Sequence, residues 1–573
     1  MTKQSPELRK GHRIVIIGAV AAGTSAAAKA RRNDEDASIT LYEMDRYISY
    51  SGCGLPYYIG GRVTDIRELT PREPAFFEKK YRVDIKIRHC VESVDPSAHT
   101  IRVRNLDTDE VFEDTYDTLV ISTGSNPVRL PIPGAELPHV FTLRNPADAI
   151  AIRSFIEDRN PKNAAIIGTG FIGLEMADNL FLRGIGITLI EKLPDICPSV
   201  DPDMAAHLEK HLLKSGVRIE SGKTAARITA SSVLLDDGTE VPADLVITAV
   251  GVRPNVSLAK DAGVALGPTG AIAVDEQLRT NIPDIYACGD CTENYFTLTG
   301  VPFYRPLGST ANKTGRITGD VITGGDYAHR GVLGTGIFET FGMTVASTGL
   351  SEKIAREQGF DVLIALNTKP DRPEYLGGRE MIIKAIADKR THMLIGVQIV
   401  GYDGVDKRMD VFVTAMTARM RVEDLFHLDL AYAPPFSTTK DPVMYTGMIL
   451  ENALDRGRAL IRKEELTERG PGGVSILDTR SEAQYAAGHI PNAKSVPQEK
   501  LREALCELDP EKPVVTYCNK GTTGNAAQNI LLNHGFREVY NLSGGYSHYA
   551  VQSDTRKESE EKKRDKEATG ATD

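Results

Sequence analysis

A strand, a glycine-rich turn and a helix occur twice in the first half of the chain, and this repeat restricts the possible folds more than any other feature. In the first copy the apolar residues 13–17 lead into a turn whose key positions are Gly18, Val20 and Gly23. In the second, residues 164–167 lead into Gly168, Gly170 and Gly173. Glycine is required there because the tight turn, the approach of a pyrophosphate and the packing of the helix each exclude a Cβ atom. The repeat predicts an α/β fold with two Rossmann-like dinucleotide-binding units.

Each unit has an acidic residue at the end of its next predicted strand. Glu43 follows Gly18 by 25 residues, and Glu191 follows Gly168 by 23. A carboxylate about 20 residues beyond the first glycine is typical of the group that binds a ribose. Because a carboxylate repels the additional phosphate of NADPH, Glu191 favours NADH over NADPH, although the neighbouring Lys192 weakens this preference.

Cys53 has no second cysteine within the next several residues. A reductase that cycles an internal disulfide needs two neighbouring thiols, whereas a single thiol can pair only with sulfur or oxygen supplied from outside. We therefore expect Cys53 to be a catalytic residue that forms its redox couple with the substrate, and we expect the protein to keep its thiol ionised.

Composition excludes several classes of function. The chain has 573 residues, 25% of them charged, and a net charge of −10, so it has no basic excess to attract nucleic acid. No apolar run approaches the roughly 20 residues of a membrane helix. Its seven cysteines show no disulfide spacing, which fits a reducing compartment. Cys288 and Cys291 lack a second ligand pair. We expect a cytoplasmic protein without a membrane or nucleic-acid partner and without a metal site.

With these parts in order, residues 10–455 resemble the single-cysteine pyridine-nucleotide disulfide oxidoreductases, a branch with coenzyme A-disulfide reductases, NADH peroxidases and NADH oxidases. The resemblance implies FAD and NADH as cofactors. Three further motifs carry it, namely residues 122–124, 249–255 and 285–290, and the helix start at 307–313 adds a fourth. It adds as cofactor-binding residues Ser122, Thr123, Gly124, Phe171, Gly251, Asp290 and Ala311. Phe171 matches the family's aromatic gate over the flavin, and packing of the turn is an equal alternative.

The resemblance also implies a homodimer and a coenzyme A site. Residues 331–455 resemble the family's dimerisation domain, in which Tyr432 would reach the partner's Cys53. The segment 56–61 resembles coenzyme A-disulfide and persulfide reductases more than peroxidases. In those relatives, coenzyme A is handled at the positions of Lys29, Arg32, Ser49, Asn312 and Arg316. A solvated helix face is the alternative for Lys29 and Arg32.

A breaker cluster at residues 470–473 marks the start of another domain. Segments 475–480, 488–493 and 514–518 resemble the rhodanese family. There Cys518 ends a strand and enters a loop, with a helix expected from about Asn525, so that backbone N–H groups and the helix dipole would stabilise a thiolate or persulfide. Thr523 stands where rhodaneses often have an arginine, and Lys520 partly replaces that charge. A thiol persulfide or polysulfide donor is therefore favoured over thiosulfate.

The expected domains are an FAD-binding domain (10–125 and 260–330), an NADH-binding domain (126–259), an α+β dimerisation domain (331–455), a linker (456–472), an α/β rhodanese domain (473–552) and a disordered tail (553–573). The expected function is FAD-dependent, NADH-driven reduction of persulfides, polysulfides or coenzyme A disulfides, with the rhodanese domain relaying sulfane sulfur. Two alternatives stay open. One is an NADH peroxidase or oxidase that cycles a sulfenic acid on Cys53, and the other is a slow-turnover flavin-containing sulfur carrier or redox sensor.

Overall fold

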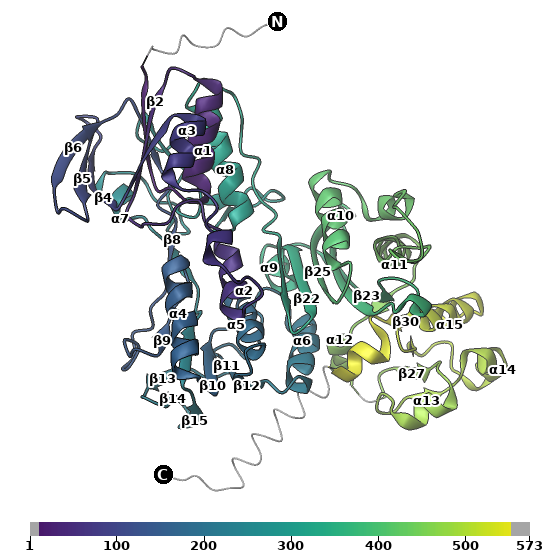
Figure 1. Ribbon diagram of the computed structural model, residues 1–573. Coiled ribbons are helices and arrows are strands. Elements are labelled where there is room, and N and C mark those ends of the chain that lie inside the picture. The colour runs from purple at the N-terminus through teal and green to yellow at the C-terminus, as the bar shows by residue number, and fades with distance from the viewer. Residues whose placement is uncertain (1–10, 471, 552–573) are drawn as a thin grey trace, which may run out of the picture. The chain divides into compact units, whose positions relative to one another are not determined.

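The structure, a computed structural model, describes residues 11–470 and 472–551 (Figure 1). It forms two compact units. Unit 1 contains the chain up to Pro194 together with Ile219–Gly334, and unit 2 contains Asp195–Arg218 and the chain from Thr335 onward. The tail expected at 553–573 lies outside the described residues. In the described part, no helix has both the length and the apolar character needed to span a bilayer.

The first sheet of unit 1 carries the first glycine turn. Its five parallel strands have the order β18-β7-β1-β2-β3. They are β1 (Arg13–Ile17), β2 (Ser38–Glu43), β3 (Val83–Ile87), β7 (Thr118–Ile121) and β18 (Ile285–Ala287). Residues 14–16 are completely buried, as a central strand covered on both faces requires. Since β18 comes late in the chain, the sheet draws on segments before residue 125 and after residue 260.

Two helices lie side by side against this sheet, α1 (Ala21–Asn33) and α8 (Gly308–Val321) (Figure 1). Their backbones touch. A Cβ atom added to Gly315 would lie 2.2 Å from the carbonyl oxygen of Ala22, and one added to Gly319 would lie 2.3 Å from that of Ala26. Small residues at a spacing of four on both helices therefore permit the contact. It brings together side chains that are almost 300 positions apart in the sequence.

The second sheet of unit 1 carries the second glycine turn and has the order β12-β11-β10-β16-β9. Its strands are β9 (Val140–Phe141), β10 (Asn163–Ile167), β11 (Gly186–Glu191), β12 (Arg218–Ser221) and β16 (Leu245–Thr248). The central β10 is parallel to β11 and β16, and its residues 164–166 are completely buried. The helices α4 (Pro146–Arg159) and α5 (Phe171–Phe181) belong to this half. Two such sheets confirm the prediction of two Rossmann-like units.

Smaller elements complete unit 1. Two antiparallel sheets consist of β4 (His89–Asp95), β5 (Thr100–Asn105) and β6 (Val111–Thr115), and of β13 (Ala225–Ile228), β14 (Ser232–Leu235) and β15 (Glu240–Pro242). Two-stranded ribbons pair β8 (Ser125–Pro127) with β17 (Val252–Pro254) and β19 (Asn294–Tyr295) with β20 (Pro302–Phe303). The short helices are η1 (Gly52–Gly54), α2 (Leu55–Gly60), η2 (Ile66–Glu68), α3 (Pro74–Tyr81) and α7 (Ser257–Asp261).

Unit 2 contains an antiparallel sheet of order β21-β22-β25-β24-β23. Its strands are β21 (Gly336–Thr340), β22 (Met343–Gly349), β23 (Val362–Pro370), β24 (Glu380–Asp388) and β25 (Leu394–Gly401). The helices are α6 (Pro202–Lys214), α9 (Glu352–Glu357), η3 (Glu374–Leu376), α10 (Val405–Thr417), η4 (Val422–His427) and α11 (Pro442–Asp455). This is the α+β part that the sequence predicted.

The last sheet, also in unit 2, is parallel with the order β26-β30-β29-β27-β28. Its strands are β26 (Leu460–Ile461), β27 (Ser475–Asp478), β28 (Lys494–Ser495), β29 (Val514–Tyr517) and β30 (Val539–Leu542). The helices are α12 (Lys463–Glu468), α13 (Glu482–Ala487), η5 (Gln498–Lys500), α14 (Leu501–Ala504), η6 (Leu505–Glu507) and α15 (Thr522–Asn533). β26 lies inside the segment 456–472 that we expected as a linker, because a two-residue strand among charged residues leaves no periodic signal.

Candidate functional site

The first glycine turn is shaped by its own backbone. Gly18 has a φ of +102°, and a Cβ atom there would lie 2.3 Å from the carbonyl oxygen of Ser122. A Cβ atom at Gly23 would lie 1.9 Å from the oxygen of Gly18. Ser122 donates its hydroxyl to the oxygens of Ile17 and Gly18 at 2.8 and 3.0 Å. These contacts explain why both positions require glycine while Val20, the residue before α1, can carry a side chain.

The second turn repeats this arrangement and leaves its middle glycine open. Cβ atoms at Gly168 and Gly173 would lie 2.5 Å from the oxygen of Ala249 and 2.1 Å from that of Gly168. A Cβ atom at Gly170 would meet nothing within 4 Å. An open glycine at the start of a helix is what the close approach of a pyrophosphate requires. The turn therefore fits a dinucleotide.

The two predicted acidic residues lie at their turns. Glu43 accepts hydrogen bonds from the N–H groups of Ala19 and Asp45 at 2.8 and 3.0 Å, and burial raises its pKa. Glu191 accepts from the N–H and hydroxyl groups of Thr169 at 2.9 and 2.6 Å. Both carboxylates are buried at the end of the strand next to the glycine turn, which is the place of a ribose-binding group.

The other predicted cofactor motifs converge in unit 1. The Thr123 hydroxyl donates to the oxygen of Asn255 at 2.7 Å, and the Asn255 amide donates to the oxygen of Thr123 at 2.8 Å. Gly124 and Gly251 both have positive φ angles and open space at the Cβ position. Burial raises the pKa of Asp290, and the hydroxyl of Tyr304 donates to its backbone oxygen at 2.9 Å. Ala311 is buried in the first turn of α8.

Cys53 is exposed and lies in η1, immediately before α2. Protein atoms packed around the sulfur, together with the carboxyl groups of Glu175 and Asp290, raise the pKa of the Cys53 thiol. The expectation that the chain keeps Cys53 ionised is therefore corrected, because these groups favour the neutral thiol. Any stabilisation of a thiolate must come from a group that binds beside it.

Glu175 is a site residue that the sequence analysis missed. It lies on α5, four positions after Phe171, and the hydroxyl of Tyr57 donates to its Oε1 atom at 3.2 Å. Burial raises the pKa of Glu175 to about 7. The available signal was the helical spacing, because residues four apart share one face. Phe171 itself is half-buried, with the Arg305 guanidinium 5.5 Å from the centre of its ring.

Four of the five predicted coenzyme A residues lie on the paired helices α1 and α8, and the fifth, Ser49, lies in the segment between β2 and η1. The Ser25 hydroxyl of α1 donates to Asn312 of α8 at 2.8 Å. Arg32 and Arg316 are exposed. Lys29 was expected either to bind coenzyme A or to lie on a solvated helix face. Its Nζ atom pairs with Asp320 at 2.9 Å, so its charge is already compensated within the protein. Ser49 has a φ of +47° and donates its N–H group to Ala19 at 2.9 Å.

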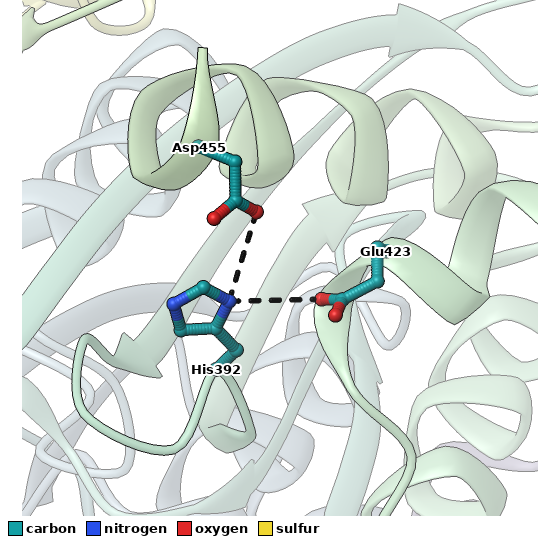
Figure 2. A group of neighbouring side chains, drawn as sticks. All are labelled: His392, Glu423 and Asp455. Carbon is teal, nitrogen blue, oxygen red and sulfur yellow. Dashed lines mark ion pairs between the residues drawn. The ribbon is translucent and has the colours of Figure 1, made fainter. Parts of the chain in front are cut away.

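Unit 2 contains Tyr432 and a cluster of charged side chains. Tyr432 is 49% exposed, and the nearby Phe436 is 70% exposed. Figure 2 shows the cluster: the Nδ1 atom of His392 lies 3.9 Å from Glu423 and 3.7 Å from Asp455. A guanidinium nitrogen of Arg421 lies 3.0 Å from the same Nδ1 atom. Arg421 also forms an ion pair with Glu423. Since its cation lies beside the atom that would ligate a metal, we interpret the cluster as a group of polar and charged side chains that satisfy one another.

Cys518 is buried at the end of β29. The loop closes at Gly521, with a φ of +89°, and α15 begins at Thr522, three residues before the start predicted at Asn525. The backbone of Tyr546 donates to the oxygen of Cys518 at 2.8 Å, and fixes the loop. The helix start thus lies closer to the thiol than predicted, which strengthens the effect of the helix dipole.

Lys520, which we expected to replace part of the charge of the rhodanese arginine, has a carboxylate partner of its own. Its ammonium group pairs with the carboxylate of Glu380, on β24. Thr523, in the place of the rhodanese arginine, carries no charge. Charge for an anionic donor must therefore come from elsewhere.

Comparisons with known proteins agree with this geometry. The family model described as pyridine nucleotide-disulphide oxidoreductase matches residues 12–305, that of its dimerisation domain matches 338–442, and a rhodanese-like domain matches 462–552. The coenzyme A disulfide reductase of Staphylococcus haemolyticus is 32% identical over 437 residues, which is 76% of this chain and 98% of the relative.

Two solved structures extend the similarity to the C-terminal domain. Reduced Bacillus anthracis CoADR-RHD has a TM-score of 0.93 at 36% identity, over 94% of this chain and 98% of that one. A NAD-dependent persulfide reductase from A. fulgidus has a TM-score of 0.88 at 37% identity, over 94% and 100%. The resemblance drawn from the motifs is confirmed. The chain belongs to the pyridine nucleotide-disulphide oxidoreductases and carries a rhodanese-like domain.

Proposed function

We propose that the protein is an FAD-dependent, NADH-driven reductase of persulfides, polysulfides or coenzyme A disulfides, and that its rhodanese domain supplies sulfane sulfur. The observation that carries the proposal is the pairing of two chemistries on one chain. Cys53 is a lone thiol, with no disulfide, in the unit with two dinucleotide turns, and Cys518 is the thiol of a sulfur-transfer loop. The relatives whose names mention coenzyme A disulfide and persulfide reduction support this choice.

The overall reaction balances with one NADH. The Cys53 thiolate attacks the S–S bond of a substrate RSSR′, this bond breaks as R′S⁻ leaves with the electron pair, and the mixed disulfide Cys53–S–S–R remains. NADH with one proton then converts Cys53–S–S–R into the Cys53 thiol and RSH, with NAD⁺ as the other product. FAD, when bound, would carry the electron pair from NADH to the mixed disulfide of Cys53. The chain's own contribution is to hold nucleotides at the two glycine turns, with Glu191 selecting NADH, and to hold the Cys53 sulfur near Glu175.

Glu175 is suited to exchange a proton at this site. Its pKa of about 7 means that it is partly protonated near neutral pH, and its charge acts on Cys53. A carboxyl group with this pKa can give a proton to a departing thiolate and take it back. We assign it this role.

Coenzyme A is assigned to the surface of α1 and α8. Arg32 and Arg316 are exposed on helices whose backbones touch, so both can face the phosphates of one ligand. Asn312 and Ser49 supply polar groups nearby. Lys29 contributes through its pair with Asp320 and not as a free charge.

The dimerisation domain supports a homodimer, in which the exposed Tyr432 extends toward the Cys53 of the partner subunit. Tyr432 of one subunit and Cys53 of the other would then form an active site shared between two copies. A reducing compartment such as the cytoplasm fits the seven cysteines, all of which are unpaired.

The test is a steady-state comparison of the wild type with Cys53→Ser, using coenzyme A disulfide, a thiol persulfide, peroxide and oxygen as acceptors for NADH. We expect turnover with the two sulfur substrates, and at least a 1000-fold loss in the variant, because an alcohol cannot form the mixed disulfide. Cys506→Ser, which removes another exposed thiol, is the matched control. Turnover confined to peroxide or oxygen would refute the proposal in favour of a peroxidase or oxidase. Flavin reduction without reoxidation by any acceptor would favour a carrier or sensor.

A further inference from the structure

The loop that holds Cys518 is in contact with the hairpin of β23 and β24, within unit 2. Two contacts join them: the Nζ atom of Lys369 donates to the Thr522 hydroxyl at 3.0 Å, and Lys520 pairs with Glu380. A third contact, from the N–H group of Leu366 to Ser543 at 2.9 Å, joins the hairpin to the segment that follows β30. The hairpin belongs to the dimerisation domain, so a second domain forms one side of the sulfur-transfer loop.

Lys369 is the residue of the hairpin best placed to act there. Thr522 is the first residue of α15, four positions after Cys518, and Lys369 bonds its side chain directly. The ammonium group lies 4.0 Å from the centre of the Tyr445 ring and is half-buried. Among the residues that the structure describes, Lys369 forms no ion pair with a carboxylate. Its charge is therefore available to an anion at the loop.

Electrostatics agree with this placement. Burial lowers the pKa of Lys369, and Cys518 acts on it in the opposite direction, in agreement with the contact between Lys369 and Thr522 four positions after Cys518. Lys520 and Lys440 lower it further. The positive charge of Lys520 is offset by Glu380, whereas Lys369 donates to the Thr522 hydroxyl at the start of α15 with no carboxylate beside it in the described residues.

We propose that Lys369, contributed by the dimerisation domain, completes the sulfur-transfer site of Cys518. There it stabilises an anion in place of the arginine that rhodaneses often have at the position of Thr523. The inference rests on the proposed function and deepens it, because it assigns anionic sulfane-sulfur compounds, persulfides or thiosulfate, as donors at this site. Lys369 stabilises the negative charge on the reacting sulfur atoms but makes and breaks no bond itself. We therefore class it as a positioning residue.

The chemistry of the step needs no oxidant or reductant. The Cys518 thiolate attacks the outer sulfur of a donor RSSH, a bond forms between the two sulfur atoms, and the S–S bond of the donor breaks. RS⁻ leaves with the electron pair, and Cys518–S–SH remains. Negative charge is present on Cys518 before the step and on the leaving group after it, so a fixed ammonium group stabilises both states.

The first experiment measures the reactivity of Cys518 with iodoacetamide as a function of pH, by peptide mass spectrometry on the full-length FAD-loaded protein. In Lys369→Gln we expect Cys518 to be labelled more slowly than in the wild type at the same pH, as for a thiol that loses a neighbouring cation. Transfer of sulfur from thiosulfate to cyanide should fall about tenfold in kcat/KM, the equivalent of one pKa unit. Lys369→Arg should keep both values near those of the wild type.

Lys389→Gln is the matched control. Lys389 follows the same hairpin at its opposite end, where its Nζ atom pairs with Asp361 at 2.9 Å, and its removal should leave Cys518 unchanged. Glu380→Gln tests the direction of the charge effect, because it releases the charge of Lys520 and should speed the labelling of Cys518. An unchanged labelling rate of Cys518 and unchanged transfer in Lys369→Gln would overturn the proposal, as would an equal effect in Lys389→Gln.

The NADH-dependent reduction of coenzyme A disulfide separates this proposal from the function on which it rests. That reaction depends on Cys53 and should be the same in all four variants. If the wild type lacks it, the proposed function fails, whereas the labelling and cyanide assays still report on Lys369.

Discussion

Replacing Lys384 by methionine should loosen unit 2 where the rhodanese segment is attached. Lys384 is 1% exposed, and its Nζ atom lies 3.0, 2.9 and 3.0 Å from carboxylate oxygens of Asp201, Asp203 and Glu352. Glu352 also pairs at 2.8 Å with Arg462, the residue before α12. One ammonium group on β24 therefore holds the starts of α6 and α9 to the antiparallel sheet of unit 2. Through Glu352 it also connects to Arg462, at the start of the rhodanese domain.

The magnitude follows from these distances. A pair of charges about 3 Å apart attracts by about 5 kcal/mol at an effective dielectric constant of about 20. Three such attractions offset the desolvation of the ions, which costs several kcal/mol each. Burial alone lowers the pKa of Lys384, yet the three carboxylates outweigh it and the pKa is raised. Removing the cation leaves the buried carboxylate of Asp201 and that of Asp203 without the ion pair they have in the described structure, while Glu352 keeps Arg462. We expect a loss of about 3–5 kcal/mol in the free energy of unfolding.

Scanning calorimetry of the full-length protein measures this loss. For a unit of this size the midpoint should fall by about 6 to 20 °C, and hydrogen exchange should accelerate at residues 380–388. Lys389→Met, which removes an exposed pair with Asp361, is the control and should cost about 0–1 kcal/mol. A fall below about 2 °C, the shift for less than 1 kcal/mol, or one no larger than in the control, would refute the reasoning.

The pH dependence provides a second check on Lys384. Burial raises the pKa of Glu352, but Lys384 and Arg462 outweigh this effect and the pKa is lowered. Such a group contributes stability above its unfolded pKa, and this stability is lost as pH falls through the folded value. The difference between wild type and Lys384→Met should therefore shrink as the pH falls below about 4.

Three further predictions concern the thiols and a histidine pair. Glu175→Gln removes a negative charge near Cys53 and should lower the midpoint of its alkylation by about one pH unit; an unchanged midpoint would contradict the coupling. His207 and His548 bond at 2.8 Å, and burial lowers both pKa values to about 3. They therefore give stability above about pH 6.5 that is lost on acidification, and His548→Asn should flatten the calorimetric midpoint between pH 7 and 5; an equally steep profile would argue against this. Cys518→Ser should abolish transfer from thiosulfate to cyanide while NADH-dependent coenzyme A disulfide reduction continues; loss of both activities would mean an obligate relay.

The sequence predicted those parts of the site that depend on neighbours along the chain. Gly18 and Gly168 are specified because the backbone of their own turn has a positive φ angle, and Glu43 and Glu191 lie at the ends of the strands that follow. The solitary Cys53 and the loop of Cys518 are equally visible, since a thiol either has or lacks a neighbour in the sequence.

Other parts were decided only by the tertiary structure. Lys29 is paired with Asp320, Glu175 acts on Cys53, and Glu380 offsets Lys520; each pair joins segments that are more than 100 residues apart. A local pattern contains no information on which distant charge a side chain will meet, or on how far burial will shift its pKa. The sequence by itself therefore determined the turns, the strands and the reactive sulfur atoms, because steric exclusion and backbone hydrogen bonding act over a few residues. The tertiary structure decided their charge states, because Coulomb interactions and desolvation depend on whatever the fold packs beside them.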